Sequence, residues 1–418
     1  MFFEPKVIPR FNCARTVRGV LVAGWAALAF GGCQQDHRSS LLKVDTLPGG
    51  VVRVISAGAT AWEGSSGWRL EPLSAIDPPA GSEGELINPT ALAFAADDRL
   101  FVSDGGPPSI KVFDTAGRFV RRIGREGEGP GEFRSAAATV VGPIIVVHDP
   151  KLQRTTLLDT TGAYRTSWPS TCCAFGKPIG LENGRLAIPA VIPYDSTGRI
   201  SVAGYIDFDS AGVPHDSVAL PTGPIDNTAP RYWSIKKGGK NGTMSGAAAI
   251  PFLPSYLSVR LGNGSIAAGF TGQYQIAEGR RRSDTTRIFG RVWTPVPISD
   301  QQRRDAIEET VAAHVARFDE AELRKVFRLE DVPKTSPAFT AIMPDGAGNL
   351  WIRVPTERDL TTTTLDVFDR DRAYLGQVVV ADRWPGYFRA AWGRDVVAVQ
   401  METTDGRPYL ARYRVVRR

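Results

Sequence analysis

Six polar residues between positions 104 and 149 have the types and spacing of a ligand or ion site. Asp104 and Asp149 each end an apolar run and are followed by turn-forming residues. A hard cation would need several such carboxylate oxygens to converge. The same carboxylates can instead cap turns by accepting hydrogen bonds from backbone N–H groups, and this simpler role is favoured. The candidate ligand-binding residues are Asp104, Arg125, Glu126, Arg134, His148 and Asp149.

The sequence contains no motif that identifies catalytic residues, which stay unknown. It has no GxSxG elbow, HExxH helix or phosphate-binding loop. His37 and His314 lie in an expected tether and an expected helix, and His148 and His215 are far apart in sequence, so no zinc site is indicated. The Gly-rich segment 236–242 lacks the Walker spacing and is expected to be a mobile basic loop. We predict no cofactor, with a divalent cation such as calcium left open.

The N-terminal segment is predicted to direct export. A basic region through Arg18 precedes an apolar run, 20–30, which is too short to span a bilayer. The run leads to Gly31-Gly32-Cys33 and resembles a bacterial lipoprotein signal, in which the cysteine is lipidated. Residues 1–32 are then the signal peptide and 33–50 a tether, and the mature protein is held at a membrane of the cell envelope, periplasmic or outer-membrane associated. An ordinary secretory signal and an uncleaved anchor remain alternatives.

Charge and cysteine content follow from that export. Four basic residues and one acidic residue lie in the signal segment, so without it the formal net charge falls from +6 to +3. This balance is not that of a nucleic-acid-binding surface, and we expect no nucleic-acid partner. Apart from Cys13 and Cys33, the chain has only the adjacent pair Cys172-Cys173. The pair could form a strained vicinal disulfide in an oxidising compartment or two buried reduced thiols, and the residues alone leave both open.

Residues 88–134 show the unit from which the chain is built. Apolar runs with strand-like alternation are separated by clusters of Asp, Gly and Pro. Four strands joined by tight turns predict one antiparallel sheet. The runs lie at 92–94, 100–102, 110–113 and 119–123.

A turn motif indicates that this sheet repeats. Asp114-Thr115-Ala116-Gly117 recurs 45 residues later at 159–162, then at 209–212, and in degenerate form at 369–372. The spacing is that of a four-stranded propeller blade. Asp at the first position and Gly at the fourth suit a type I turn followed by a residue with positive φ. With the turns between first and second strands, six copies are found, starting near Asn88, Ala138, Pro178, Pro254, Ala338 and Phe388.

This pattern resembles the bacterial six-bladed β-propeller lipoprotein family related to NHL-repeat proteins. The residues that carry the resemblance are 100–104, 110–114 and 124–133, read as LFVSD, IKVFD and GREGEGPGEF. The resemblance implies an all-β six-bladed propeller over residues 51–418. It also implies that strands within 51–76 close the ring by pairing with the last blade, which leaves no open sheet edge.

Residues 299–332 depart from the all-β pattern. Ser299 and Gln302 form a capping-box pair, and Asp319 is placed to cap a second short helix. We predict a helical insertion between blades four and five, with charged residues such as Arg303 on a solvated outer face. Its apolar residues at helical spacing are Ile307, Val311, Val315 and Phe318.

Blade topology directs the sequence-based expectation for function. Loops from the second to the third strand, and from the fourth strand to the next blade, leave one face of a propeller around its channel. That face would carry loops 104–108 and 124–134 and the helical insertion. We expect a non-enzymatic binding module for a peptide, glycan or partner protein, although fold alone does not fix function. A cation-dependent hydrolase or lyase using Asp104 and Asp149 is the alternative.

Overall fold

The computed structural model describes residues 42–58, 62, 67–171, 174, 176–193, 201–221, 232–239, 242–281, 284–357, 361–386 and 389–417. The predicted signal peptide, Cys33 and the pair Cys172-Cys173 lie outside these residues, so the lipidation and disulfide predictions stay predictions. Within the described part, no helix is long and apolar enough to cross a membrane.

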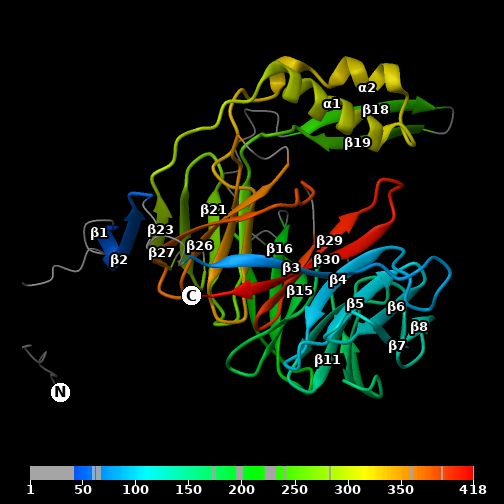
Figure 1. Cartoon of the computed structure of the whole chain (residues 1–418). Helices are drawn as coiled ribbons and strands as arrows, with labels where there is room; N and C mark the ends of the chain where they lie inside the picture. Colours follow the sequence, from blue (N-terminus) through cyan, green and yellow to red (C-terminus); the bar gives the residue numbers. More distant parts are fainter. Residues whose placement is uncertain are drawn as a thin grey trace, which may run out of the picture. The chain divides into compact units, whose positions relative to one another are not determined.

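Six four-stranded antiparallel blades follow one another along the chain, as Figure 1 shows. Blade one has β4 (Pro89–Phe94), β5 (Leu100–Gly105), β6 (Pro108–Phe113) and β7 (Phe119–Ile123). Blade two has β10 (Ala137–Val141), β11 (Ile144–Asp149), β12 (Arg154–Asp159) and β13 (Tyr164–Pro169). Blade three has β14 (Ile179–Gly180), β15 (Leu186–Pro193), β16 (Ser201–Phe208) and β17 (Pro214–Ala219).

The second half of the ring is built in the same way. Blade four has β20 (Tyr256–Arg260), β21 (Ile266–Phe270), β22 (Gln275–Gly279) and β23 (Thr285–Arg291). Blade five has β24 (Ala341–Pro344), β25 (Leu350–Val354), β26 (Thr363–Phe368) and β27 (Tyr374–Val380). Blade six has β28 (Ala390–Trp392), β29 (Val396–Glu402) and β30 (Pro408–Val416), with β3 (Arg69–Ile76) as its outermost strand. The fold predicted from the sequence, a six-bladed β-propeller, is confirmed.

The N-terminal strands have two different partners. β3 pairs antiparallel with β30, with Arg69 opposite Val416, and closes the ring. β2 (Val51–Ser56) instead pairs in parallel with β23, and β1 (Leu42–Leu47) pairs with β2, so both extend blade four to six strands. The prediction that all of 51–76 closes the ring is therefore wrong for 51–56. The predicted tether is also too long, because β1 and a 3-10 turn (Pro48–Gly50) occupy its last residues.

The repeated Asp turn has the same geometry in four blades. In blade one, Asp114 Oδ1 accepts hydrogen bonds from the backbone N–H of Ala116 at 3.0 Å and of Arg118 at 2.9 Å, while Gly117 has a φ of 86°. Equivalent bonds are made by Asp159, Asp209 and Asp369. The Asp side chain thus satisfies the turn's free N–H groups, as the motif predicts.

Adjacent blades pack through side chains that alternate along the strands. Phe101 and Val112 of blade one meet Ile145 and Leu158 of blade two in one buried cluster. Burying each such side chain contributes about 1.5–3 kcal/mol. The middle strands are largely apolar on both faces, and the buried charges that they hold, such as Lys111 of β6 and Asp366 of β26, are paired within the protein.

Two insertions form a second layer of structure outside the ring. The first, between blades three and four, is a hairpin of β18 (Tyr232–Gly239) and β19 (Gly242–Ala249); the second, between blades four and five, holds α1 (Asp300–His314), α2 (Glu320–Val326) and η3 (Leu329–Asp331). We call these elements together the insertion subdomain. Figure 1 shows the hairpin beneath the two helices. The expectation of a mobile loop at 236–242 is wrong, because residues 236–239 and 242 belong to paired strands.

The insertion subdomain has its own core. Trp233 and Ile235 of the hairpin pack against Val311 of α1 and Leu323 of α2, and all four are buried. Trp233 also donates from Nε1 to Asp331 Oδ2 at 2.9 Å. Neither insertion could bury these side chains alone, so the helices and the hairpin stabilise one another.

The helix ends are as the sequence predicts, with one correction. Ser299 and Gln302 form a capping box, and Asp319 caps α2. Arg303, however, is buried and does not lie on a solvated face. Its guanidinium donates to Asp300 Oδ1 at 2.7 Å and to Val332 O at 2.8 Å. This arginine satisfies a carbonyl at the end of the helical segment, which the residue spacing does not reveal.

Candidate functional site

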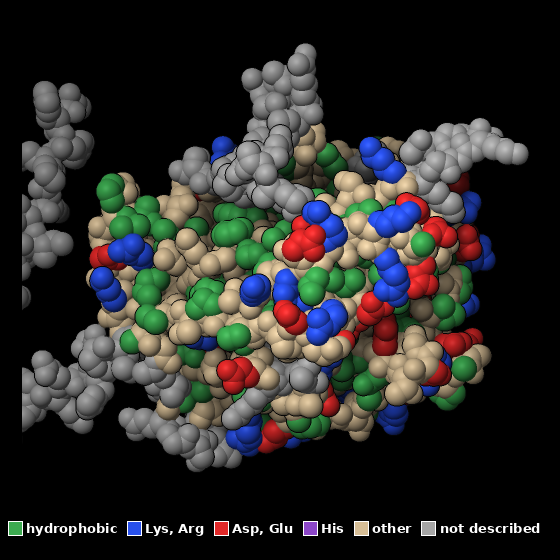
Figure 2. Space-filling model, turned by 90° about the horizontal axis from the view of Figure 1, so that it is seen from above, with side chains coloured by type: hydrophobic (Ala, Val, Ile, Leu, Met, Phe, Trp, Pro, Cys, Tyr) green, Lys and Arg blue, Asp and Glu red, His purple; other side chains and the backbone are tan. Residues whose placement is uncertain are grey.

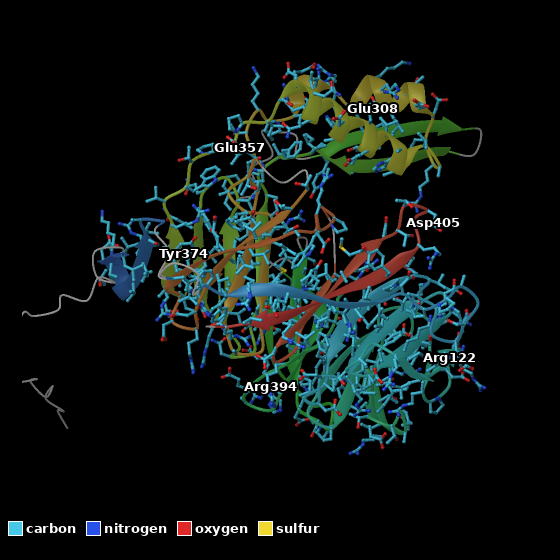
Figure 3. The ribbon with its side chains drawn as sticks, in the orientation of Figure 1. Arg122, Glu308, Glu357, Tyr374, Arg394 and Asp405 are labelled. Atoms are coloured by element: carbon cyan, nitrogen blue, oxygen red, sulfur yellow. The ribbon has the colours of Figure 1, made fainter. Side chains whose placement is uncertain are left out.

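The two faces of the ring can be told apart by their turns. Asp405 lies in the turn between β29 and β30, and Arg394 lies in the turn between β28 and β29. Figure 3 shows Asp405 on the side of the insertion subdomain, where α1 carries Glu308, and Arg394 on the opposite side. We call the side with the second-to-third-strand turns and the insertion subdomain the insertion face. By the same topology, loops 104–108 and 124–134 belong to it.

The insertion face has charges of both signs. Figure 2 looks onto this side and shows Lys and Arg side chains interspersed with Asp and Glu. On the insertion subdomain, Arg324 pairs with Glu308 at 2.7 Å and with Glu320 at 2.8 Å. Exposed pairs of this kind contribute at most about 1 kcal/mol each. They give the helices a polar outer surface and do not mark a ligand site.

Asp104 is buried at the end of the second strand of blade one. Its Oδ1 accepts from the N–H of Asn88 at 2.8 Å and of Gly106 at 3.0 Å, and its Oδ2 accepts from the N–H of Ile87 at 2.9 Å. Lys111 Nζ lies 2.7 Å from Oδ2. The carboxylate therefore ties the segment leading into blade one to the turn between β5 and β6.

Asp149 has the corresponding place in blade two. Its Oδ2 accepts from the N–H of Arg134 at 2.7 Å and of Ser135 at 3.0 Å. Its Oδ1 accepts from the N–H of Lys151 and of Leu152, both at 3.1 Å. The two aspartates thus share one geometry, in which both oxygens of each carboxylate are hydrogen-bonded within the protein.

His148 is also buried and bonded internally. Its Nε2 lies 2.9 Å from Ala174 O, and its Nδ1 lies 3.4 Å from Ser170 Oγ. Burial lowers the pKa of His148 below its usual value, because it disfavours the charged ring. The imidazole therefore joins the turn after blade two to β11.

The loop 124–134 is a small ordered structure at the surface. β8 (Arg125–Glu126) pairs in parallel with β9 (Glu132–Phe133), and Arg125 forms an ion pair with Glu132 at 2.8 Å. Arg134 reaches Glu126 at 3.4 Å. Arg154 of blade two donates to backbone carbonyls of the loop and fixes it to the ring. Arg125, Glu126 and Arg134 lie at the surface. That they contact a ligand stays a prediction.

The sequence did not indicate the cavity of the central channel. Its volume is about 920 Å³, and it is lined by the innermost strands of all six blades: β4, β10, β14, β20, β24 and β28. The lining is largely aliphatic, with Leu92, Val140, Ile179, Val259 and Ile342 among its members. None of the six candidate residues named from the sequence lines it. A mainly apolar cavity of this size with few polar groups is the usual form of a ligand site.

Lys177 is a part-buried cation in this channel. It precedes β14 in blade three, and its Nζ donates to Leu92 O of blade one at 3.0 Å. This hydrogen bond joins blades three and one, which are not neighbours in the ring. Burial lowers the pKa of Lys177, since the charged ammonium loses solvation.

Two arginines also line the channel. Arg389 precedes β28 and donates from Nε to Thr90 O at 2.9 Å and from Nη1 to Gln400 Oε1 at 3.2 Å. Arg260, at the end of β20, donates to Asp207 Oδ2 at 2.7 Å and is buried between blades three and four. The channel is thus mainly apolar, with three cationic side chains at its wall and the acidic Glu182 and Asp345 also among its lining residues.

The sequence does contain a signal for Lys177. The third repeat starts near Pro178, so the lysine just before it marks where an inner strand begins. In a propeller that point lies at the channel wall, and a long cation there can reach the lumen. The sequence alone does not distinguish this position from an ordinary surface lysine, because the arrangement of the blades in the ring must be known.

Among the described residues, no group of three or more His, Cys, Asp and Glu side chains is arranged to hold a metal ion. Asp104 and Asp149 do not form a hard-cation site in that part of the chain, because their carboxylate oxygens already accept hydrogen bonds from backbone N–H groups.

Comparison with known proteins supports the fold and does not indicate a specific function. Residues 83–151 match a family model described as a 6-bladed beta-propeller, a range that covers blade one and the first two strands of blade two. The fold is that of a six-bladed β-propeller. No curated protein matches the sequence.

Solved structures with a similar arrangement share little sequence with this chain. A Bacteroides fragilis protein described as exported aligns with a TM-score of 0.47 and 13% identity, covering 86% of this chain and 97% of that one. A DUF4221 family member from Bacteroides vulgatus aligns with a TM-score of 0.46 and 8% identity, covering 85% and 100%. An inactive virginiamycin B lyase from Staphylococcus aureus, solved with quinupristin, aligns with a TM-score of 0.39 and 10% identity, covering 83% and 99%. At these values no function is transferred to this propeller.

Proposed function

We propose that this propeller is a non-catalytic binding protein whose ligand occupies the central channel. The observation that carries the proposal is the apolar cavity of about 920 Å³ lined by the inner strand of every blade. Its volume lies in the range of about 300–1,000 Å³ typical of small-molecule and cofactor sites. The proposal places the ligand in the channel, and the surface loops named from the sequence have at most an accessory role.

The lining disfavours one of the ligand classes expected from the sequence, the glycan. A glycan would bring many hydroxyl groups against aliphatic side chains, and unpaired polar groups are costly in such surroundings. A small apolar molecule or an apolar peptide segment matches Leu92, Val140 and Ile342 better. We therefore propose a ligand with an apolar body.

The hydrolase or lyase alternative has no comparable support. It would need free carboxylate oxygens at Asp104 and Asp149, and each of these oxygens already accepts at least one backbone N–H. A cation would have to displace those bonds and the Lys111 ion pair.

We further propose that the protein is exported and held at a membrane by a lipid on Cys33. The support is the sequence alone: the basic region, the short apolar run and Gly31-Gly32-Cys33. A binding module so placed would act in the cell envelope on a ligand from that compartment.

Obstruction of the channel tests the proposed function. Gly386 lines the channel, and a Cβ added there meets no atom within 4 Å, so a larger side chain projects into open space. The probe is the fluorescence of 1-anilinonaphthalene-8-sulfonate titrated with the full chain. We expect saturable binding by the native protein and by Gly386→Ala, and its loss in Gly386→Trp at unchanged thermal stability. Equal binding by all three would show that the channel is not the site.

A further inference from the structure

Lys177 has spare hydrogen-bonding capacity inside the channel. An ammonium group has three N–H donors, and one of them is directed to Leu92 O at 3.0 Å. That acceptor is a neutral carbonyl. In the described part of the chain, no Asp or Glu forms an ion pair with Lys177, in contrast to Lys111, whose ammonium lies 2.7 Å from Asp104. A part-buried cation with a neutral partner favours the approach of an anion.

A second cation is anchored to the same strand edge. Arg389 donates from Nε to Thr90 O, two residues before the carbonyl that holds Lys177. Carbonyls of alternate residues point to the same side of a strand and lie about 6.6 Å apart. The two positive groups therefore come from blades six and three to neighbouring points on β4. An anion near Leu92 would experience both charges.

The rest of the lining specifies the other part of the ligand. Ala93, Val140, Ile179 and Ile342 present aliphatic surface around the same lumen. Such surface is suited to an unbranched or weakly polar chain. One anionic group on an apolar body thus matches the part-buried ammonium of Lys177 in a mainly apolar channel.

We propose that Lys177 binds the carboxylate of an apolar monocarboxylate, with the apolar body of the ligand in the channel. This inference rests on the proposed function, since it assumes that the channel takes a ligand. The ammonium keeps its bond to Leu92 O and directs a further N–H to a carboxylate oxygen. Arg389 adds positive potential from the adjacent point of β4. Two sources share this chemistry: a free fatty acid, and the C-terminus of a short apolar peptide.

A matched ligand pair tests the charge. Decanoate and decan-1-ol are titrated into the full chain by calorimetry below their micelle-forming or saturating concentrations. Charge-assisted hydrogen bonds discriminate by about 10-fold or more, so decanoate should bind at least that much more tightly. Lys177→Met should lose this preference while still binding decan-1-ol, and Lys177→Arg should retain it. Lys151→Met, a change at an exposed turn, is the control and should match the native protein.

The source of the carboxylate is decided by a second pair. A tetrapeptide of leucine residues with a free C-terminus is compared with its amide, both acetylated at the N-terminus. Preference for the free peptide over decanoate assigns the site to peptide C-termini, and the reverse assigns it to fatty acids.

Stability gives a readout that a structural lysine would not share. A part-buried cation kept for binding destabilises the empty protein, so Lys177→Met should raise the melting temperature. If Lys177→Met has a lower melting temperature and an unchanged affinity for decanoate, Lys177 has a structural role only and the inference is wrong. If decanoate and decan-1-ol bind equally and Gly386→Trp blocks both, the carboxylate inference fails while channel binding stands. If Gly386→Trp blocks neither, the proposed function itself fails.

Discussion

Arg372 and Glu278 form a buried bidentate ion pair across the junction of blades five and four. Nε of the arginine lies 2.7 Å from Oε2 of the glutamate, and Nη2 lies 3.1 Å from Oε1. Arg372 occupies the turn position that glycine holds in three other blades, and it has a φ of 68°. The residue thus accepts a left-handed backbone conformation in order to place its guanidinium on the neighbouring blade.

Removal of the arginine should be strongly destabilising. Arg372→Gly restores the turn residue of the other blades but leaves Glu278 buried without its ion-pair partner. Loss of one partner of a buried pair costs about 3–5 kcal/mol, so the free energy of unfolding in urea should fall by that order. The double variant Arg372→Gly with Glu278→Gln should recover part of the loss.

The matched control is an exposed pair at the same kind of turn. Arg118 bonds Asp114 in blade one, and 82% of its side chain is exposed. Arg118→Ala should change the free energy of unfolding by less than about 1 kcal/mol. Similar losses in Arg372→Gly and Arg118→Ala would contradict the role of the buried pair.

The same ion pair should make stability depend on acid pH. Burial by itself raises the pKa of Glu278, and the hydrogen bonds and charge of Arg372 more than offset this, so the pKa lies below its ordinary value. A carboxyl with a lowered folded-state pKa contributes stability above its unfolded pKa of about 4.3 and loses it as the pH falls toward the folded value. The melting temperature of the native protein should therefore fall below pH 4.3 more steeply than that of Glu278→Gln. Parallel curves for the two proteins would exclude this contribution.

The insertion subdomain should depend on contacts between its two segments. Leu323 of α2 is fully buried in the core that Trp233 of β18 shares. Leu323→Ala should cost about 2–5 kcal/mol, because it leaves a cavity. Limited proteolysis should then cut the subdomain before the ring, since the blades have separate cores. Exposed Arg324→Ala on the same helix is the control and should leave the cleavage pattern unchanged.

Membrane attachment should require one cysteine. If Cys33 carries a lipid, Cys33→Ser should release the protein from the membrane fraction, and inhibition of lipoprotein signal peptidase should leave an unprocessed precursor. Fractionation followed by immunoblotting measures both. Cys13→Ser, a change within the same predicted signal, should leave fractionation unaltered. Retention of Cys33→Ser in membranes would point to an uncleaved anchor.

The blade repeat and the starts of the helices can be predicted from local patterns in the sequence. The turns that begin with Asp are local structures in which one side chain satisfies the N–H groups of the next few residues, so their spacing marks four of the six blades. The turns between first and second strands mark the others. The caps at Ser299 and Asp319 are local in the same sense. Such features need no knowledge of distant partners.

The candidate site, in contrast, depends on contacts between segments that are distant in the sequence. Lys177 and Leu92 are 85 residues apart, and they meet because the ring closes on itself. Asp104 and Asp149 cap their own turns, as the sequence favoured, but their further bonds to the preceding segments are not visible in a residue pattern. The channel is formed by six strands from six blades, and the hairpin 232–249 becomes stable through helices that follow it by more than 50 residues. In each case the deciding contact is between distant segments, and local propensity carries no information about it.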